Sequence, residues 1–338
     1  MAQEKGCQRK VWGDKLTVCL VYPNVYRIGM ANLGFQTVYS LLNGLPFCLC
    51  ERAFLSPPGE GGASREKGLV SLESQRPLKD FDIVAFAIPF ENDYPHILDI
   101  LAGAGMPLQA SLRKDPEPLV MAGGIAVALN PEPLSSFVDL FLLGEAEEAL
   151  PEFAGRYWEA LTQGLDRRQR LFAVQRDVAG AYVPRFYSVS YSPDGAIEEI
   201  LPVDSALPQK IQRRWEKDLC AFRTEQIIST PGTEFGDLFL VEVSRGCFRG
   251  CRFCAAGFVY RPVRFRRKEA LEPSLIRGIA DGKRIGLLGT AVSDHPQRVE
   301  LSRSARCGWT GSMAKSPDCS GNPGWRPLPW HRRRELSA

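Results

Sequence analysis

The sequence has 338 residues, of which 44% are hydrophobic and 24% charged, and its formal net charge is +3. This length suggests two or three domains with a substantial core, and the composition is that of an ordinary soluble globular protein. A net charge so close to zero gives no reason to expect nucleic-acid binding. The sequence shows neither a signal-peptide pattern nor an apolar stretch that would cross a membrane. We therefore expect a cytoplasmic protein, and ten cysteines without a disulfide-type pattern suit that compartment.

Residues 10–165 alternate between predicted strands and predicted helices. The strands are apolar runs and the helices have an apolar face. Strands are predicted at 16–22, 47–54, 83–89, 119–122 and 138–143, and helices at 30–45, 94–103 and 146–161. Strands that are apolar on both faces are typical of parallel sheets, so this order predicts an α/β domain with a doubly wound parallel sheet. A ligand of such a sheet lies beyond the carboxyl ends of the strands.

Two further units follow in the sequence. Apolar and polar residues alternate over 181–203 around the turn Ser192-Pro-Asp-Gly195, which predicts a β-hairpin. We interpret residues 166–234 as a small β-rich connector. Residues 235–296 begin with an apolar strand at 238–244 and contain a second strand near Gly286, so they are expected to form a separate domain.

Cys247, Cys251 and Cys254 form a CxxxCxxC motif in a loop that follows the strand at 238–244. Three thiolates in one loop can hold three irons of a cubane iron–sulfur cluster and leave one iron open. A structural zinc site is the first alternative, but it needs four ligands, and only Cys307, Cys319, His295 and His331 follow. Inert buried thiols are the second alternative.

This loop, Arg245-Gly-Cys-Phe-Arg-Gly-Cys-Arg-Phe-Cys254, resembles the signature loop of the radical S-adenosylmethionine (radical SAM) enzymes, including the aromatic residue at Phe253. The resemblance implies a 4Fe-4S cluster on the three cysteines, S-adenosylmethionine on the open iron and cleavage to a 5′-deoxyadenosyl radical. It also implies that residues 235–296 are the first part of a (β/α) barrel. Phe253 would then pack near the adenine, and Gly289 and Ser293 would contact the cofactor.

The segment from about residue 10 to 296 resembles radical SAM proteins that have an N-terminal cobalamin-binding-like domain. Three stretches carry this resemblance, namely 22–34, Gly123-Gly-Ile-Ala-Val-Ala-Leu-Asn-Pro-Glu-Pro133 and Gly144-Glu-Ala-Glu147. Asn24, Tyr26 and Gly29 occupy the positions of the family's cobalt-binding DxHxxG motif, with tyrosine in place of histidine. Gly123 and Gly124 match a glycine pair that lets a ligand approach the backbone. The alternative is a domain of this fold that binds no cobalamin.

Charged residues near these motifs have simpler interpretations. Glu145, Glu147 and Glu148 are expected to complement the dipole of the helix that they begin. The basic stretch 261–268 is interpreted as a solvated face, with binding of a carboxylate or a polyanion as the alternative. His295, which precedes Pro296, is expected to be a turn residue rather than a metal ligand.

Residues 297–338 differ from the rest of the sequence. Three of the six tryptophans lie there (Trp309, Trp325 and Trp330), and no helical or strand period is evident. We expect an aberrant or disordered tail produced by truncation or a shifted reading frame near residue 297. Only about two of the βα units of a radical SAM barrel would then precede it, so the chain is expected to be an inactive fragment of an enzyme family.

The predicted function is that of a radical SAM enzyme, with cobalamin as a further cofactor and a flavodoxin or ferredoxin as electron donor. Two alternatives stay open. The first is a tRNA-modifying enzyme similar to the methylthiotransferases, which would need an RNA-binding module that the sequence does not show. The second is a non-catalytic remnant that binds zinc or a cluster. The substrate is not indicated by the sequence.

Overall fold

The computed structural model describes residues 4–57 and 68–307. Its largest element is a six-stranded sheet with strand order β2-β1-β3-β4-β5-β6. The first five strands are parallel, and β6 is antiparallel to β5. Their bounds are β1 Leu16–Val25, β2 Cys48–Leu55, β3 Ile83–Ala87, β4 Leu119–Gly123, β5 Leu140–Leu142 and β6 Ala181–Tyr182. This mostly parallel sheet confirms the predicted α/β class.

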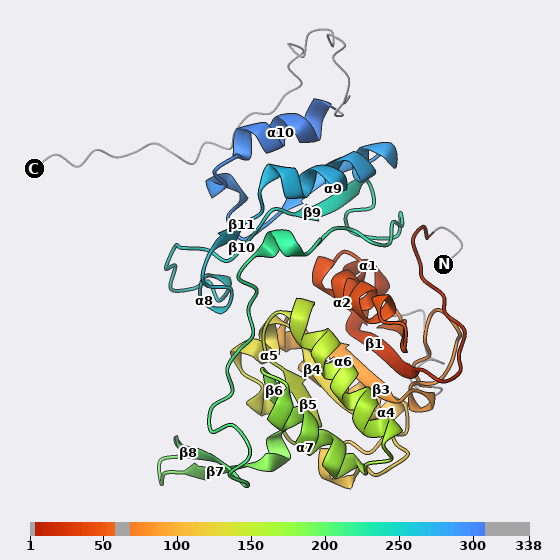
Figure 1. The fold of residues 1–338 in the computed structure, drawn as a ribbon, viewed down its shortest axis with the longest axis vertical. Coiled ribbons are helices and arrows are strands. Elements are labelled where there is room, and N and C mark those ends of the chain that lie inside the picture. Colours follow the sequence, from red (N-terminus) through yellow and green to blue (C-terminus); the bar gives the residue numbers. More distant parts are fainter. Residues whose placement is uncertain (1–3, 58–67, 308–338) are drawn as a thin grey trace, which may run out of the picture.

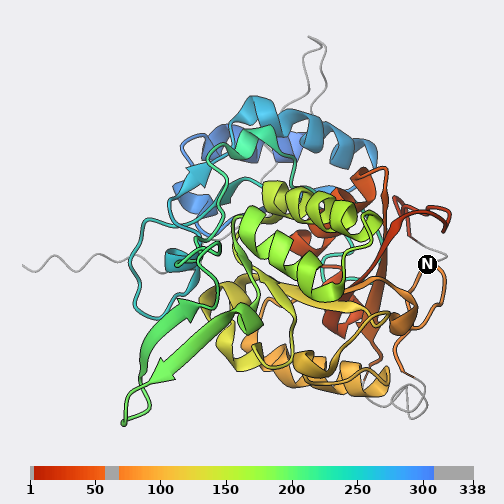
Figure 2. The ribbon, with the colours of Figure 1, turned by 60° about the horizontal axis from the view of Figure 1, so that its bottom comes forward.

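Helices cover both faces of this sheet (Figures 1 and 2). Helix α2 packs on α6 and α6 packs on α7, whereas α4 contacts β1 on the other side. The side chain of Asn32 accepts a hydrogen bond from the Phe35 amide and thereby begins α2 two residues after the predicted start. The helices are α1 Tyr26–Gly29, α2 Leu33–Gly44, α4 Tyr94–Gly103, α5 Ile125–Leu129, α6 Ala146–Thr162 and α7 Arg167–Asp177.

The predicted hairpin is confirmed as β7 (Tyr187–Tyr191) and β8 (Ile197–Pro202), which pair antiparallel and project from the rest of the fold (Figure 2). Residues 167–182, at the start of the predicted connector, form α7 and β6 instead and pack with the large sheet. They do so because α7 begins with a complete capping box, Asp166 with Gln169, and because β6 pairs with β5. The division into domains otherwise stays a prediction.

A second, smaller α/β unit follows. Strands β9 (Leu238–Glu242) and β12 (Arg284–Leu288) are parallel neighbours, and α9 (Lys268–Ala280) connects them. Strands β10 (Ser244–Arg245) and β11 (Arg264–Phe265) pair antiparallel, with α8 (Ala256–Val259) between them. These strands and α9 form one βαβ unit, and its identity as the first part of a (β/α) barrel stays a prediction.

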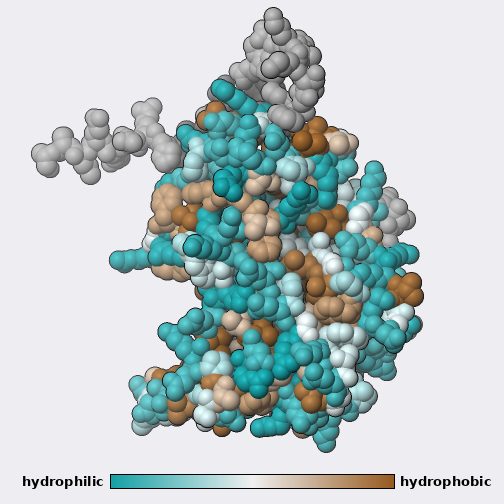
Figure 3. Space-filling model, viewed as in Figure 1, coloured by the Kyte–Doolittle hydropathy of each residue, from teal (hydrophilic) through white to brown (hydrophobic). Residues whose placement is uncertain are grey.

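Short 3-10 turns join these elements. They are η1 Leu78–Asp80, η2 Glu91–Asp93, η3 Ala110–Leu112, η4 Glu132–Leu134, η5 Pro184–Phe186, η6 Leu219–Ala221 and η7 Val292–Asp294. Hydrophilic residues cover most of the face shown in Figure 3, and the apolar groups on it are small and scattered. Within the described ranges no helix is both long and apolar enough to span a membrane.

The expectation that regular structure ends at residue 296 is wrong for the residues that directly follow. Helix α10 spans Arg298–Cys307. Its Leu301 is 1% exposed and packs in a core cluster with Phe239, Val241 and Leu275. The helix, RVELSRSARC, contains few large apolar residues, so its helical character was not recognised from the sequence. The rest of the predicted tail, from residue 308, lies outside the described residues.

Leu301→Ala is expected to destabilise the second unit by about 2–5 kcal/mol, because it removes a buried leucine from a small core. Urea unfolding followed by circular dichroism measures this change. Val299→Ala is the matched control on the same helix: Val299 is 53% exposed, so a change of less than about 0.5 kcal/mol is expected. Equal effects of the two substitutions would show that α10 does not pack on this core.

Candidate functional site

The cysteine loop begins where two short strands meet. Strands β10 and β11 pair Ser244 with Phe265 and Arg245 with Arg264, so both ends of the loop are held together at its base. Gly246 begins the loop with a φ of +84°, and a Cβ atom there would lie 2.3 Å from the carbonyl oxygen of Tyr260. Only glycine suits this conformation and this space. The signature residue Gly246 is therefore required by the backbone itself.

The three thiols of the loop are unpaired and differ in exposure. Cys247 is 8% exposed, Cys254 is partly exposed and Cys251 is exposed. The Cys254 amide donates a hydrogen bond to the Cys251 carbonyl at 3.1 Å, which bends the chain between these two residues. Among the described residues, no group of three or more His, Cys, Asp or Glu side chains is arranged to hold a metal ion. The fit to an iron–sulfur cluster therefore rests on the donor set, which is three free thiols in one short loop.

The base of the loop is fixed to the first domain by one buried carboxylate, Glu145. Arg264 binds its Oε1 at 2.6 Å and its Oε2 at 2.9 Å, and Arg245 binds Oε2 at 2.9 Å. Glu145 lies in the turn after β5, about 100 residues before the loop, and is 5% exposed. One acidic side chain thus holds an arginine from each of the two strands that close the cysteine loop.

Two more carboxylates complete this buried cluster. Arg245 also binds Glu147 at 2.6 Å and Glu242 at 2.9 Å, and Glu242 in turn binds Arg266 at 2.7 Å. Buried charges are tolerated when they are paired and hydrogen-bonded in this way. Three carboxylates and three guanidinium groups therefore join the turn after β5 to the strands around the loop.

The pKa values in the cluster follow from these contacts. Burial alone would raise the pKa of Glu145, but the hydrogen bond from Arg264 and the charge of Arg245 outweigh burial and lower that pKa. Burial is likewise outweighed at Glu242 by Arg245 and Arg266, so its pKa is also lowered. Glu216 differs, since burial and the neighbouring glutamates raise its pKa. Glu145 and Glu242 are therefore ionised at neutral pH.

These contacts extend one interpretation made from the sequence and correct another. Glu147 and Glu148 lie in the first turn of α6, as expected, and they also bind Arg245 and Arg214. Glu145, at the N-cap of that helix, binds arginines of both loop strands. Arg264 and Arg266, taken as part of a solvated face, are 8% and 2% exposed. The sequence offered no signal for pairs this far apart in the chain.

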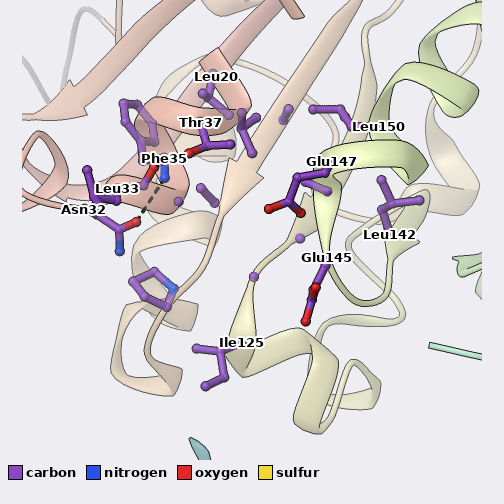
Figure 4. A pocket seen from close by; sticks show the side chains of 18 of the residues that line it. Leu20, Asn32, Leu33, Phe35, Thr37, Ile125, Leu142, Glu145, Glu147 and Leu150 are labelled. Carbon is purple, nitrogen blue, oxygen red and sulfur yellow. Dashed lines mark hydrogen bonds between the residues drawn. The ribbon is translucent and has the colours of Figure 1, made fainter. Parts of the chain in front are cut away.

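A cavity of about 330 Å³ adjoins this cluster. Its apolar interior lies between the large sheet and helices α2 and α6, and its lining includes Leu20, Leu33 and Leu150 (Figure 4). Its lining also includes Ser244 and Arg245 from the base of the loop, and Gly289 and Thr290, which follow β12. The cavity therefore joins the carboxyl ends of the strands in both units.

The residues predicted for cobalamin separate into two groups. Gly123 and Gly124 line the cavity, whereas Asn24, Tyr26 and Gly29 are not among the described residues that line it. Asn24 donates a hydrogen bond to Asp93 at 3.0 Å, and the Tyr26 hydroxyl donates one to Glu4. A Cβ atom at Gly29 would lie 2.4 Å from Phe54. These three residues thus have structural roles, and burial with the bond to Glu4 raises the pKa of Tyr26, so its phenol stays protonated.

The residues predicted for S-adenosylmethionine are likewise spread out. Gly289 lines the cavity. Ser293 lies in η7 beside a separate hollow, and Phe253 is 92% exposed.

His295, one of the residues considered for zinc, does not join the loop. Both ring nitrogens of His295 are engaged by the backbone, at 3.0 Å from the Arg266 carbonyl oxygen and 3.0 Å from the Gln297 amide, as expected of a turn residue. Cys319 and His331 lie outside the described residues, as does the side chain of Cys307.

Comparison with known proteins adds two findings. A family model described as "Radical SAM proteins, N-terminal" matches residues 34–184. Uncharacterized protein MJ0966 of Methanocaldococcus jannaschii is 27% identical over 289 residues, which cover 84% of this chain and 51% of that protein. The chain thus spans about half the length of this relative. Residues 34–184 are therefore similar to the N-terminal part of radical SAM proteins.

Glu145→Gln is expected to destabilise the protein by about 3–5 kcal/mol at pH 7, because it leaves Arg264 buried without its carboxylate. Urea unfolding at a series of pH values measures this difference. Since folding lowers the pKa of Glu145 from its ordinary 4.5, its stabilising effect is full above pH 4.5 and is lost as the pH falls through the lower, folded value.

Glu148→Gln is the control for this substitution. The Glu148 side chain is 55% exposed, and an exposed ion pair contributes about 1 kcal/mol or less. A pH-independent difference between wild type and Glu145→Gln would contradict the ionised pair.

Proposed function

We propose that this chain carries the cluster-binding part of a radical SAM enzyme, with Cys247, Cys251 and Cys254 as ligands of a 4Fe-4S cluster. One observation carries the proposal: three unpaired thiols share one loop at the carboxyl end of β9, and Glu145 holds both of the strands that close this loop. The family match to residues 34–184 supports it from a different part of the chain.

The loop's own residues have distinct tasks in this proposal. When bound, the cluster supplies one electron to the C5′–S bond of S-adenosylmethionine, which yields methionine and a 5′-deoxyadenosyl radical. Cys247 anchors the buried side of the loop, while Cys251 and Phe253 lie at the surface, where a reduced flavodoxin or ferredoxin can approach. Gly289 lies at the end of β12 directly against Ser244, whose hydroxyl would be 2.3 Å from a Cβ at this position, and it is the proposed contact for the cofactor's amino group.

Anaerobic reconstitution with iron and sulfide is expected to load about four irons per chain, with the broad visible absorption of an iron–sulfur cluster. Cys251→Ala is expected to lose most of this iron, because only two thiols of the loop remain. The control is Cys220→Ala, at a partly exposed cysteine outside the loop. Zinc bound in place of iron, or equal iron in both variants, would favour the alternative of a non-catalytic remnant.

Cobalamin is a second proposed cofactor, as the alternative to a small molecule at the same edge of the sheet, and two observations favour it. The strand order 2-1-3-4-5 is that of flavodoxin-like domains, whose ligands lie at the carboxyl ends of the strands. Gly123 and Gly124 line a cavity at that edge. Any cobalamin bound here would lack a cobalt ligand from Tyr26, because that hydroxyl donates to Glu4 and keeps its proton.

Tyr26→Phe is therefore expected to leave cobalamin binding unchanged, whereas Gly124→Val is expected to abolish it. Gly124 has a φ of +116°, and its Cβ would lie 2.4 Å from the Ile88 carbonyl oxygen. Retention of hydroxocobalamin through gel filtration, read from the visible spectrum, measures both variants, and circular dichroism checks that each is folded. A wild-type protein that retains no cobalamin would refute this second proposal and leave the first intact.

A further inference from the structure

The cavity lies where the carboxyl ends of two parallel sheets face each other. Ile88 and Gly124 come from the ends of β3 and β4, and Ser244 and Gly289 come from the ends of the smaller unit's strands. Ligands of parallel α/β sheets bind at this edge, and a volume of about 330 Å³ lies within the range of small-molecule sites. We propose that this cavity binds an uncharged molecule with an apolar body and a hydroxyl or amide group. That this molecule is the substrate rests on the proposed radical chemistry.

The interior of the cavity accounts for the apolar body of the ligand. Side chains from four elements line it: Leu20 of β1, Ala85 of β3, Leu33 and Val38 of α2, and Leu150 and Phe153 of α6. Figure 4 shows Leu20 and Leu33 on one side of this space and Leu142 and Leu150 on the other. An apolar group placed here leaves water without giving up a hydrogen bond.

One polar group in the lining lacks a partner. The Ser244 hydroxyl is buried, with the residue 1% exposed, and no described residue makes a hydrogen bond with its Oγ. Buried hydroxyls are nearly always hydrogen-bonded, so this one is suited to a group on the ligand.

Glu147 offers a second hydrogen-bonding position at the same end of the cavity. Its side chain points into the cavity, and its Oε1 accepts from Arg245 at 2.6 Å. Among the described residues this is the one hydrogen bond found for that carboxylate, so Oε2 remains as an acceptor. A hydroxyl or amide N–H on the ligand can donate to it.

The charges around the cavity exclude an anionic ligand. In the described part of the chain, Arg245 is the one cationic side chain of the lining. It already binds Glu145, Glu147 and Glu242. A carboxylate or phosphate would therefore meet three glutamates and no free cation, and burying it would be costly.

A matched pair of probes tests this proposal on the full chain without cluster or S-adenosylmethionine. Isothermal titration at pH 7.5 compares 4-propylphenol, which is uncharged, with 4-propylbenzoate, which has the same apolar body and a negative charge. The phenol is expected to bind with a dissociation constant at least about tenfold lower than that of the benzoate. The reason is that burying the unpaired carboxylate of the benzoate costs more free energy than the loss of one hydrogen bond.

Two variants locate the binding site. Ser244→Ala is expected to weaken phenol binding about three- to tenfold, as loss of one hydrogen bond does, without lowering the melting temperature of the free protein, because it removes an unpartnered hydroxyl. Val38→Phe is expected to abolish binding by filling the interior. The controls are Ser274→Ala, at a buried serine of α9, and Val203→Phe, at a residue that is 56% exposed, and neither is expected to change binding.

Equal binding of the two probes, or no effect of Ser244→Ala and Val38→Phe, would overturn the inference. Retained hydroxocobalamin that blocks the phenol would also overturn it, because the cavity would then belong to that cofactor. The binding assay is separate from the iron assay. If the protein binds the phenol but takes up no iron–sulfur cluster, the cavity is a binding site but not a substrate site of radical chemistry. If it takes up the cluster but does not bind the phenol, only the proposed binding site is refuted.

Discussion

The shared carboxylate of Glu145 is the contact on which the arrangement of this site depends. It accepts hydrogen bonds from Arg245 before the cysteine loop and from Arg264 after it. Glu145 itself is held by the turn after β5, where Gly144 has a φ of +121° and its Cβ would lie 2.1 Å from the Arg214 carbonyl oxygen. The position of the loop is therefore set by the end of a strand in the other unit. This gives the first domain a role in the site whether or not it binds a cofactor.

The same contact creates the cavity. Because Arg245 and Glu147 bring the base of the loop to the first turn of α6, the carboxyl ends of β3, β4 and β5 come to face those of β9 and β12 across one enclosed space. A molecule in that space would touch both units, including Ser244 and Arg245 at the base of the cysteine loop. In our account the buried ion pairs around Glu145 position the loop. The cysteines hold the iron–sulfur cluster, and the cavity holds the molecule that reacts.

The sequence predicted elements well where the signal was local. The apolar run at 83–89 became β3, the pattern at 94–103 became α4 with the same bounds, and Ser192-Pro-Asp-Gly195 became the hairpin turn. Helix α10 was missed because it contains few large apolar residues, of which Leu301 packs in the core. The cysteine motif could be found because its ligands lie within one loop.

The contacts around that loop could not be predicted in the same way. Glu145 and Arg264 are far apart in the chain, and either residue alone has an ordinary explanation at a helix start or on a basic surface. Only the folded chain brings them together. Tyr26 shows the opposite error. Its position matches a cobalt-binding motif in the sequence, but in the structure its hydroxyl donates a hydrogen bond to Glu4 and so supports the fold.

The central claim is that the loop carries a cluster with one iron open to S-adenosylmethionine. Electron paramagnetic resonance of the anaerobically reconstituted and reduced protein, recorded before and after addition of S-adenosylmethionine, tests it most directly. The account predicts the signal of a reduced 4Fe-4S cluster whose g values change when S-adenosylmethionine is added. A cluster signal that does not change, or no signal from folded protein that has taken up iron, would contradict it.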